Sequence, residues 1–207
     1  VTSSEEDVTD IHNRIINMID QILANNNINS CDIEIVTPEE KNMILNVFNN
    51  TNVDYPKDKT IVDLFEEQVE KTPDNIAVVF ENQKLTYREL NEKANSLAYL
   101  LRKKYQIKPN DLIGIMIPRS LEMIIAILAI LKSGGAYTPI DPNFPKERID
   151  YMLKNGNAKL LLSLNKLKQL TDFDNVLVID LNIKEIYDLP HNNIKNINQP
   201  DDLAYII

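Results

Sequence analysis

The sequence is poor in the residues that build metal and disulfide sites. Among its 207 residues there is one cysteine, Cys31, and there are two histidines, His12 and His191. A single cysteine cannot close a disulfide within the chain, and these three side chains cannot supply the four ligands of a zinc cage. We therefore expect no metal site built from these residues and a lone thiol at Cys31. His12 is expected to be a boundary residue beside apolar Ile11 and Ile15 within the first helix, and His191 to be solvated in a loop.

Glycine is almost as scarce, with four residues at positions 114, 134, 135 and 156. This number is too small for a glycine-rich dinucleotide fingerprint, and Lys132 precedes the glycine pair where a nucleotide-triphosphatase loop needs lysine after its glycines. The glycines also do not bracket Ser133, as they would in the nucleophile elbow of a hydrolase. These three kinds of site are excluded.

Positive charge is in deficit, since 22 basic residues face 31 acidic ones and the net charge is −9. Nucleic acid and anionic membranes would both be repelled, so neither is expected as a partner. The longest apolar run, residues 123–131, is about half of the ~20 residues that span a bilayer. The first residues are acidic and polar, unlike a signal peptide. We predict a cytoplasmic protein.

The first 59 residues predict two helices and a linker. Apolar residues recur at helical spacing over residues 4–23, with Ser4 as the expected N-cap and Asp7 at the third helical position. The asparagine-rich residues 25–30 should end this helix. Thr37-Pro-Glu-Glu40 combines a cap, a proline at the first position and a reciprocal glutamate, and predicts a second helix to about Phe48. Residues 49–59 are polar and are expected to be a linker.

From residue 60 onward, predicted helices and strands alternate. Helices are expected from Thr60, where Ile61, Leu64, Phe65 and Val69 share a face, and over residues 86–104, 120–133 and 145–154, with a helical turn over 166–171. Strands are expected over residues 76–80, 111–118, 136–141, 160–163, 176–180 and 203–207. This alternation predicts an α/β fold with a mostly parallel sheet flanked by helices on both faces.

Two short segments stand out within this part. The first, Leu85-Thr-Tyr-Arg-Glu-Leu90, is explained by helix capping: Thr86 caps the helix, Glu89 reaches back to the Thr86 amide, and Leu85 can pack on Leu90. No substrate contact is needed to account for it.

The second segment is Leu131-Lys-Ser-Gly-Gly-Ala-Tyr-Thr-Pro-Ile-Asp-Pro142. Its glycine pair could form a phosphate nest and Asp141 could bind a metal. A helix stop at Gly134, a tight turn and a strand ended by proline account for the same residues, and we favour this interpretation. Asp201 and Asp202 could likewise hold a cation, but acidic residues before a strand are more typical of a solvated loop.

Together these two segments resemble the first two core motifs of the amino-acid adenylation domains of nonribosomal peptide synthetases. From residue 33 to residue 163 the chain is similar to the junction between a condensation domain and the adenylation domain that follows it. The resemblance is supported by Thr37-Pro-Glu-Glu40, Asn49-Asn-Thr-Asn-Val-Asp-Tyr-Pro56, Leu64-Phe-Glu-Glu-Gln68, Lys71-Thr-Pro-Asp74 and Arg119-Ser-Leu-Glu122.

The resemblance implies three segments: residues 1–32 as the C-terminal helix of a condensation-like domain, 33–59 as an interdomain linker, and 60–207 as the N-terminal part of an adenylation domain that stops before the phosphate loop. It implies a parent enzyme that uses ATP and Mg to activate an amino acid as aminoacyl-AMP and loads it onto the phosphopantetheine thiol of a carrier domain. The implied partners are the condensation domain, the remainder of the adenylation domain and the carrier domain.

No catalytic, cofactor-binding or metal-binding residue is assigned within the chain, which is expected to be inactive alone and to bind none of these cofactors. The motif positions, expected to be structural, are Leu85, Thr86, Tyr87, Glu89, Leu90, Leu131, Lys132, Gly134, Gly135, Tyr137, Pro139 and Asp141.

Two alternatives stay open. A stand-alone acyl-CoA or aryl-acid ligase would be expected to begin near residue 61, without the preceding helices. A non-catalytic structural or docking element would bind a neighbouring domain and catalyse nothing. An incomplete sheet with an open edge and an uncovered face also predicts that the isolated chain self-associates.

Overall fold

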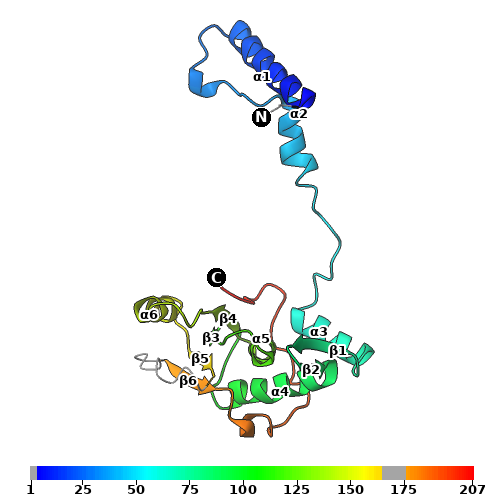
Figure 1. Ribbon diagram of the computed structural model, residues 1–207, viewed down its shortest axis with the longest axis vertical. Coiled ribbons are helices and arrows are strands. Elements are labelled where there is room, and N and C mark those ends of the chain that lie inside the picture. Colours follow the sequence, from blue (N-terminus) through cyan, green and yellow to red (C-terminus); the bar gives the residue numbers. More distant parts are fainter. Residues whose placement is uncertain (1–3, 165–175) are drawn as a thin grey trace. The chain divides into compact units, whose positions relative to one another are not determined.

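The computed structural model describes residues 4–164 and 176–207. The chain divides into two units, Val1–Tyr55 and Pro56–Ile207, and each is described by itself (Figure 1). The division falls within the polar stretch that the sequence predicts to be a linker.

The first unit begins with the predicted amphipathic helix, α1 (Glu5–Ala24). Its start is a capping box: Ser4 Oγ accepts from the Asp7 amide at 3.1 Å, and Asp7 Oδ2 accepts from the Ser4 amide at 2.9 Å. Polar side chains of α1 hold the returning chain, since Asn17 Nδ2 donates to the Glu34 carbonyl at 2.9 Å. The isoleucine, valine and leucine side chains of α1 remain exposed.

The second helix of this unit also starts at the predicted cap. Thr37 and Glu40 form a reciprocal capping box before α2 (Pro38–Asn42), and the helix continues as a wider π-turn, η2 (Met43–Val47). Arg14 of α1 pairs with Glu40 at 2.7 Å, and this hydrogen-bonded pair, assisted by the Thr37 amide, lowers the pKa of Glu40. A short 3-10 turn, η1 (Ser30–Asp32), lies between the two helices.

The second unit opens with a helix and a hairpin. Thr60 caps α3 (Ile61–Lys71) as predicted, but Ile61 and Leu64 are exposed and Val62 is the buried residue. Strand β1 (Ile76–Phe80) is confirmed, and the structure adds β2 (Gln83–Thr86), which pairs with it in an antiparallel sheet of its own. The sequence interpretation missed β2 because the capping pattern of the next helix overlaps its last residues.

The main sheet is parallel and has the strand order β4-β3-β5-β6. Its strands are β3 (Leu112–Met116), β4 (Ala136–Pro139), β5 (Leu160–Ser163) and β6 (Leu177–Asp180). The helices are α4 (Tyr87–Lys103), α5 (Leu121–Ser133) and α6 (Lys146–Asn155), followed by a 3-10 turn, η4 (Lys184–Ile186). The predicted α/β fold with a mostly parallel sheet is confirmed.

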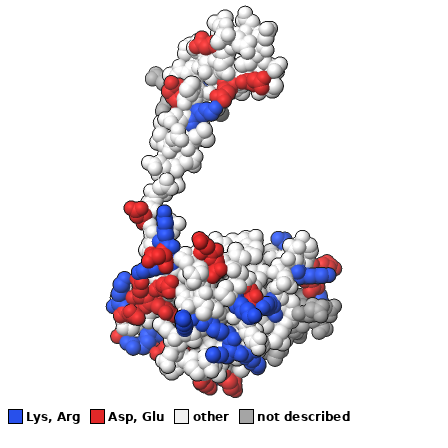
Figure 2. Space-filling view, turned by 180° about the vertical axis from the view of Figure 1, so that it is seen from behind, with Lys and Arg blue, Asp and Glu red and all other residues white. Residues whose placement is uncertain are grey.

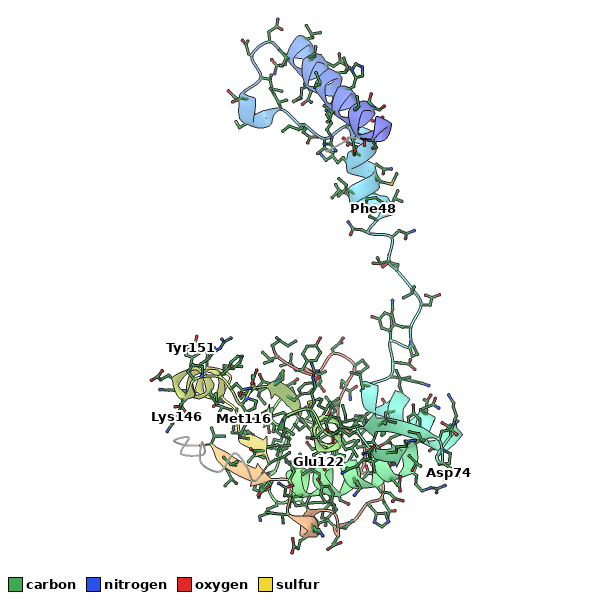
Figure 3. The ribbon with its side chains drawn as sticks, in the orientation of Figure 1. Phe48, Asp74, Met116, Glu122, Lys146 and Tyr151 are labelled. Atoms are coloured by element: carbon green, nitrogen blue, oxygen red, sulfur yellow. The ribbon has the colours of Figure 1, made fainter. Side chains whose placement is uncertain are left out.

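Helices cover both faces of this sheet because side chains alternate along each strand. On one face, Ile113 and Ile115 of β3 join a core cluster with the apolar residues of α4 and α5. On the other face, Met116 packs in a second cluster with Ile149 and Leu153 of α6. Figure 3 shows Met116 inside this unit. Gly114 permits the close approach of α6, since a Cβ there would lie 3.0 Å from Leu153 Cδ2.

Two sequence predictions near the C-terminus have different outcomes. Residues 203–207 are not a regular strand, because they make one isolated bridge, Tyr137 to Tyr205, beside β4. The helical turn predicted over residues 166–171 lies outside the described residues. Among the described residues, no helix is both long and apolar enough to cross a membrane.

Candidate functional site

The sheet topology creates one cleft at the carboxyl ends of its strands. Strand β3 leads into α5 on one face, whereas β4 leads into α6 on the other face. The two connections therefore diverge, and neighbouring strands whose connections diverge leave a crevice at their carboxyl ends. In open α/β sheets this is where ligands bind.

The structure has a cleft of about 550 Å³ at this position. Ile115 and residues 117–119 form one wall at the end of β3, and residues 139–144 form the other at the end of β4. Met123 and Ile127 of α5, together with Tyr137 of β4, complete the lining. Most of these side chains are apolar, which suits a site that shields a reacting group from water.

Two charged residues, Arg119 and Asp141, line the cleft. Asp141 is engaged in the local turn, because its Oδ1 accepts from the backbone amide of Asn143 at 2.8 Å and from the Asn143 side chain at 2.9 Å. Among the lining residues the structure therefore offers Arg119 as a cation and no pair of acid and base. Figure 2 shows basic and acidic side chains side by side over the visible face of this unit.

Tyr137 marks the edge of the cleft. Its ring centroid lies 5.6 Å from that of Tyr205, and its backbone accepts from the Ile206 amide and donates to the Ala204 carbonyl. Burial, and to a smaller extent Tyr205, raises the pKa of Tyr137. Tyr137 is therefore neutral at physiological pH. It lines the cleft, and its backbone binds residues 204–206.

The first motif lies away from the cleft and has the predicted capping geometry. Thr86 Oγ1 accepts from the Glu89 amide at 3.2 Å, and Glu89 Oε2 accepts from the Thr86 amide at 2.8 Å. Leu90 is buried in the core, and Leu85 packs against that core. The ring centroid of Tyr87, the first residue of α4, lies 6.2 Å from that of Phe65 of α3, and the two rings are tilted by 40°.

The second motif is divided among three places. Leu131 and Lys132 are buried at the end of α5, and Lys132 pairs with Glu66 of α3. Gly134 ends the helix with a left-handed φ of 106° and Gly135 follows it. Pro139, like Tyr137 and Asp141, lines the cleft.

The glycine pair does not form a phosphate nest. A Cβ at Gly134 would lie 2.9 Å from Ile197, and one at Gly135 would lie 3.0 Å from the Asp111 carbonyl. Both glycines are thus covered by protein atoms.

The cation site considered at Asp201 and Asp202 is also accounted for by protein contacts. Asp202 accepts from Asn110 Nδ2 at 2.9 Å and from the Gln199 amide at 2.7 Å. No cluster of three or more potential metal ligands occurs in residues 4–164 and 176–207. Of the isolated residues, His12, Cys31 and His191 are exposed.

Sequence reasoning overlooked the other residues of the cleft. Ile117 and Phe144 were not singled out, and Arg119 was considered only as part of the family resemblance. All three lie within five residues after the carboxyl end of β3 or β4. The signal that could have found them is positional, because the residues after neighbouring parallel strands meet at one edge.

Comparison with known proteins identifies the family to which this chain belongs. The profile of the AMP-binding enzyme family matches residues 65–207. The chain belongs to the AMP-binding enzyme family. The matched range contains the cleft, both motifs and the whole parallel sheet.

The curated relatives of this AMP-binding chain are peptide synthetases. Tyrocidine synthase 3 of Brevibacillus parabrevis is 50% identical over 189 residues, which is 90% of this chain and 3% of that protein. Gramicidin S synthase 2 of Brevibacillus brevis is 45% identical over 207 residues, 98% of this chain and 4% of that protein. The chain therefore spans a small part of the relatives it matches.

Solved structures agree. The nonribosomal peptide synthetase FmoA3 in its AMPPNP-bound form is 25% identical with a TM-score of 0.76, over 99% of this chain and 22% of that one. The NpsA N-terminal subdomain of Klebsiella oxytoca, in complex with 3-hydroxybenzoyl-AMSN, is 28% identical with a TM-score of 0.65, over 75% of this chain and 39% of that one. The resemblance to synthetase adenylation domains is confirmed.

Proposed function

We propose that this chain is part of a nonribosomal peptide synthetase that activates an amino acid as aminoacyl-AMP with ATP and passes the aminoacyl group to a phosphopantetheine thiol. The observation that carries the proposal is the 45% identity to gramicidin S synthase 2 over 207 residues. That similarity covers 98% of the chain and therefore includes most of residues 1–64, which the family profile does not match.

Within this function the chain supplies scaffold and one part of the reaction cleft. The lining formed by Ile115, residues 117–119 and residues 139–144 is mainly apolar and offers Arg119 as its cation. A single arginine at a cleft rim can bind a carboxylate or phosphate oxygen. The covered glycine pair offers no phosphate nest, so Arg119 is the one group of the cleft lining that suits a phosphate of ATP. We assign the phosphate loop, the Mg ligands and the amino-acid pocket to residues outside this sequence.

We further propose the domain assignment predicted from the sequence, with residues 1–32 belonging to a condensation-like domain, 33–59 to a linker and 60–207 to the adenylation domain. Support comes from α1, whose apolar side chains at positions 8, 11, 15, 16, 19, 22 and 23 are 43–71% exposed. An amphipathic helix with its apolar face exposed to this extent lacks a core to pack on. The condensation domain would supply that core, and a carrier domain would accept the product.

A stand-alone aryl-acid ligase is the second candidate. The similarity to the NpsA N-terminal subdomain, whose bound ligand is a 3-hydroxybenzoyl compound, favours it. That similarity covers 75% of this chain, however, whereas the similarity to the peptide synthetase covers 98%. The helices of the first unit favour the synthetase.

The test is amino-acid-dependent ATP–pyrophosphate exchange by the whole synthetase that contains this sequence. We expect exchange with one proteinogenic amino acid or a close analogue, and none with benzoic or fatty acids. Exchange that depends on an aryl or fatty acid instead would transfer the assignment to the second candidate. The 207-residue chain alone is expected to give no exchange, and turnover by it would contradict the assignment of the catalytic groups to other residues.

A further inference from the structure

An irregular segment, Leu189–Ala204, crosses the helical face of the second unit, and we call it the strap. It follows η4 and ends where residues 204–206 meet β4 (Figure 1, orange to red). Residues 203–207 make a single bridge to the sheet, so sheet pairing alone offers little to hold them. Ordering an irregular backbone costs conformational entropy at every residue. Contacts along the strap must offset that cost.

The first contacts come from a polar row on α4. Asn91 and Asn95 both donate to Asn193 Oδ1 at 2.8 Å, and Asn95 also donates to the His191 carbonyl at 2.8 Å. Ser96 Oγ donates to the Leu189 carbonyl at 3.1 Å. Asn95 is 0% exposed, and a buried amide needs hydrogen-bond partners. The side-chain nitrogens of Asn91 and Asn95 find theirs on the strap, whereas their Oδ1 atoms have no partner among the described residues. The side-chain donors on this row of α4 are therefore complementary to the acceptors of the strap.

Arg102, in the last turn of α4, joins the strap to α5. Its guanidinium donates to the carbonyls of Lys132 and Ser133 at the end of α5 and to the Lys195 carbonyl of the strap. Carbonyls at a helix C-terminus lack partners within the helix and carry partial negative charge. Arg102 thus satisfies the end of α5 and fixes the strap with the same group.

Gly134 provides the next contact. A Cβ at this position would lie 2.9 Å from Cδ1 and 3.2 Å from Cγ1 of Ile197, so the absence of a side chain makes the room that Ile197 occupies. The neighbouring Asn196 donates to Thr60 Oγ1 and to Asp63 Oδ1, both at 2.8 Å. The strap is therefore held by the N-cap of α3 and by the helix stop of the second motif.

The last contacts set the register at the cleft. Asn110 donates to Asp202 at 2.9 Å and accepts from the Leu203 amide at 2.7 Å. Tyr137 then donates to the Ala204 carbonyl at 3.1 Å and accepts from the Ile206 amide at 2.9 Å. Tyr137 lines the cleft, so the strap delivers residues 204–206 to its edge.

We propose that Asn91, Asn95, Arg102 and Gly134 are positioning residues: they seat the strap and thereby fix the register of residues 204–206 against β4 at the edge of the cleft. Their relevance to catalysis rests on the proposed function, because it requires the cleft to be the reaction site. The contacts between these residues and the strap are a property of the fold and do not depend on the proposed function. It gives the second-motif glycine a role that a phosphate nest or a simple helix stop does not include.

The test compares two adjacent strap residues by native-state hydrogen exchange of the whole chain. Asn193→Ala removes the acceptor shared by Asn91 and Asn95, whereas Asn192→Ala changes an exposed neighbour and is the matched control. We expect the Ile206 and Tyr137 amides to exchange about tenfold faster in Asn193→Ala, as loss of these hydrogen bonds favours local opening. In Asn192→Ala both rates should stay unchanged.

A second comparison tests the glycine. Gly134→Ala should also accelerate exchange of the Ile206 amide, and the acceleration should be smaller in an Ile197→Ala background, where the overlapping atoms are gone. If Gly134→Ala accelerates Ile206 exchange equally in the wild-type and Ile197→Ala backgrounds, backbone strain at position 134 alone is responsible. That result would overturn the role of Gly134 in making room for Ile197. Unchanged Ile206 and Tyr137 amides in Asn193→Ala, or equal acceleration of the β3 and β5 amides, would overturn the positioning role.

The link to the cleft is tested in the whole synthetase. ATP–pyrophosphate exchange should be impaired about tenfold by Asn193→Ala, the same factor expected for strap opening, and not by Asn192→Ala. Activity equal to wild type in both variants would overturn the link. A wild-type synthetase without exchange would contradict the proposed function, and the hydrogen-exchange comparison would still decide the strap.

Discussion

Lys132 of α5 and Glu66 of α3 form an ion pair in which the lysine side chain is 1% exposed and the glutamate 20% exposed. The lysine ammonium also lies 5.7 Å from the ring centroid of Phe65. Burial lowers the pKa of Lys132, and the hydrogen bond to Glu66 opposes that effect. The second family motif thus contributes a charge that ties two helices together.

Removing the glutamate should be more harmful than removing the lysine. Glu66→Gln leaves a buried ammonium without a counter-charge and should reduce the free energy of unfolding by about 3 kcal/mol. Lys132→Met keeps the volume and removes the buried charge, so its cost should be smaller. Urea unfolding of the 207-residue chain measures both.

The matched control for this pair is Glu67→Gln. Glu67 pairs with Lys59 at 2.5 Å, and both side chains are 37% exposed. Such a surface pair contributes about 0–1 kcal/mol. A Glu66→Gln variant no less stable than Glu67→Gln would contradict the importance of the buried pair.

The cap of α4 should have a measurable effect on stability. Thr86→Ala removes the acceptor of the Glu89 amide and should cost about 1 kcal/mol of unfolding free energy. Thr86→Ser keeps the hydroxyl and should stay close to wild type. A melting curve that is the same for Thr86→Ala and wild type would show that the capping interpretation is wrong.

The same cap predicts a pH dependence. Hydrogen bonds from the Thr86 amide and then its hydroxyl lower the pKa of Glu89 in the folded chain. Its contribution is therefore present above the unfolded pKa of about 4.3 and is lost as the pH falls through the lower folded value. The stability difference between wild type and Glu89→Gln should exist at pH 7 and diminish below about pH 4. A difference independent of pH between 7 and 3 would exclude the carboxylate as its source.

The isolated chain is predicted to self-associate through its open sheet edge. Strand β6 ends the strand order, and Leu177 on it is 54% exposed. Edge strands with exposed apolar residues pair with other chains, and a charge on the edge opposes this. Sedimentation velocity should show concentration-dependent oligomers that Leu177→Lys reduces. A stable monomer at high concentration would be evidence against this prediction.

Much of the local structure could be predicted because its causes are local. The boxes at Ser4, Thr37, Thr60 and Thr86 each join a hydroxyl to an acidic residue three positions later, and that spacing is visible in any sequence. The continuous apolar run of β3 predicted a buried central strand, and all five of its residues are buried. Hairpin strand β2 was missed because its Leu85 and Thr86 also belong to the cap of α4.

The sequence by itself determined the helix starts, the alternation of strands and helices and, through its motifs, the family. Those features depend on residues a few positions apart, whose spacing fixes their geometry. Only the tertiary structure decided that Arg119 and Asp141 share a cleft, that Lys132 meets Glu66, and that Gly134 makes room for Ile197. These residues lie far apart along the chain, and their meeting depends on strand order and helix packing, which no local pattern encodes.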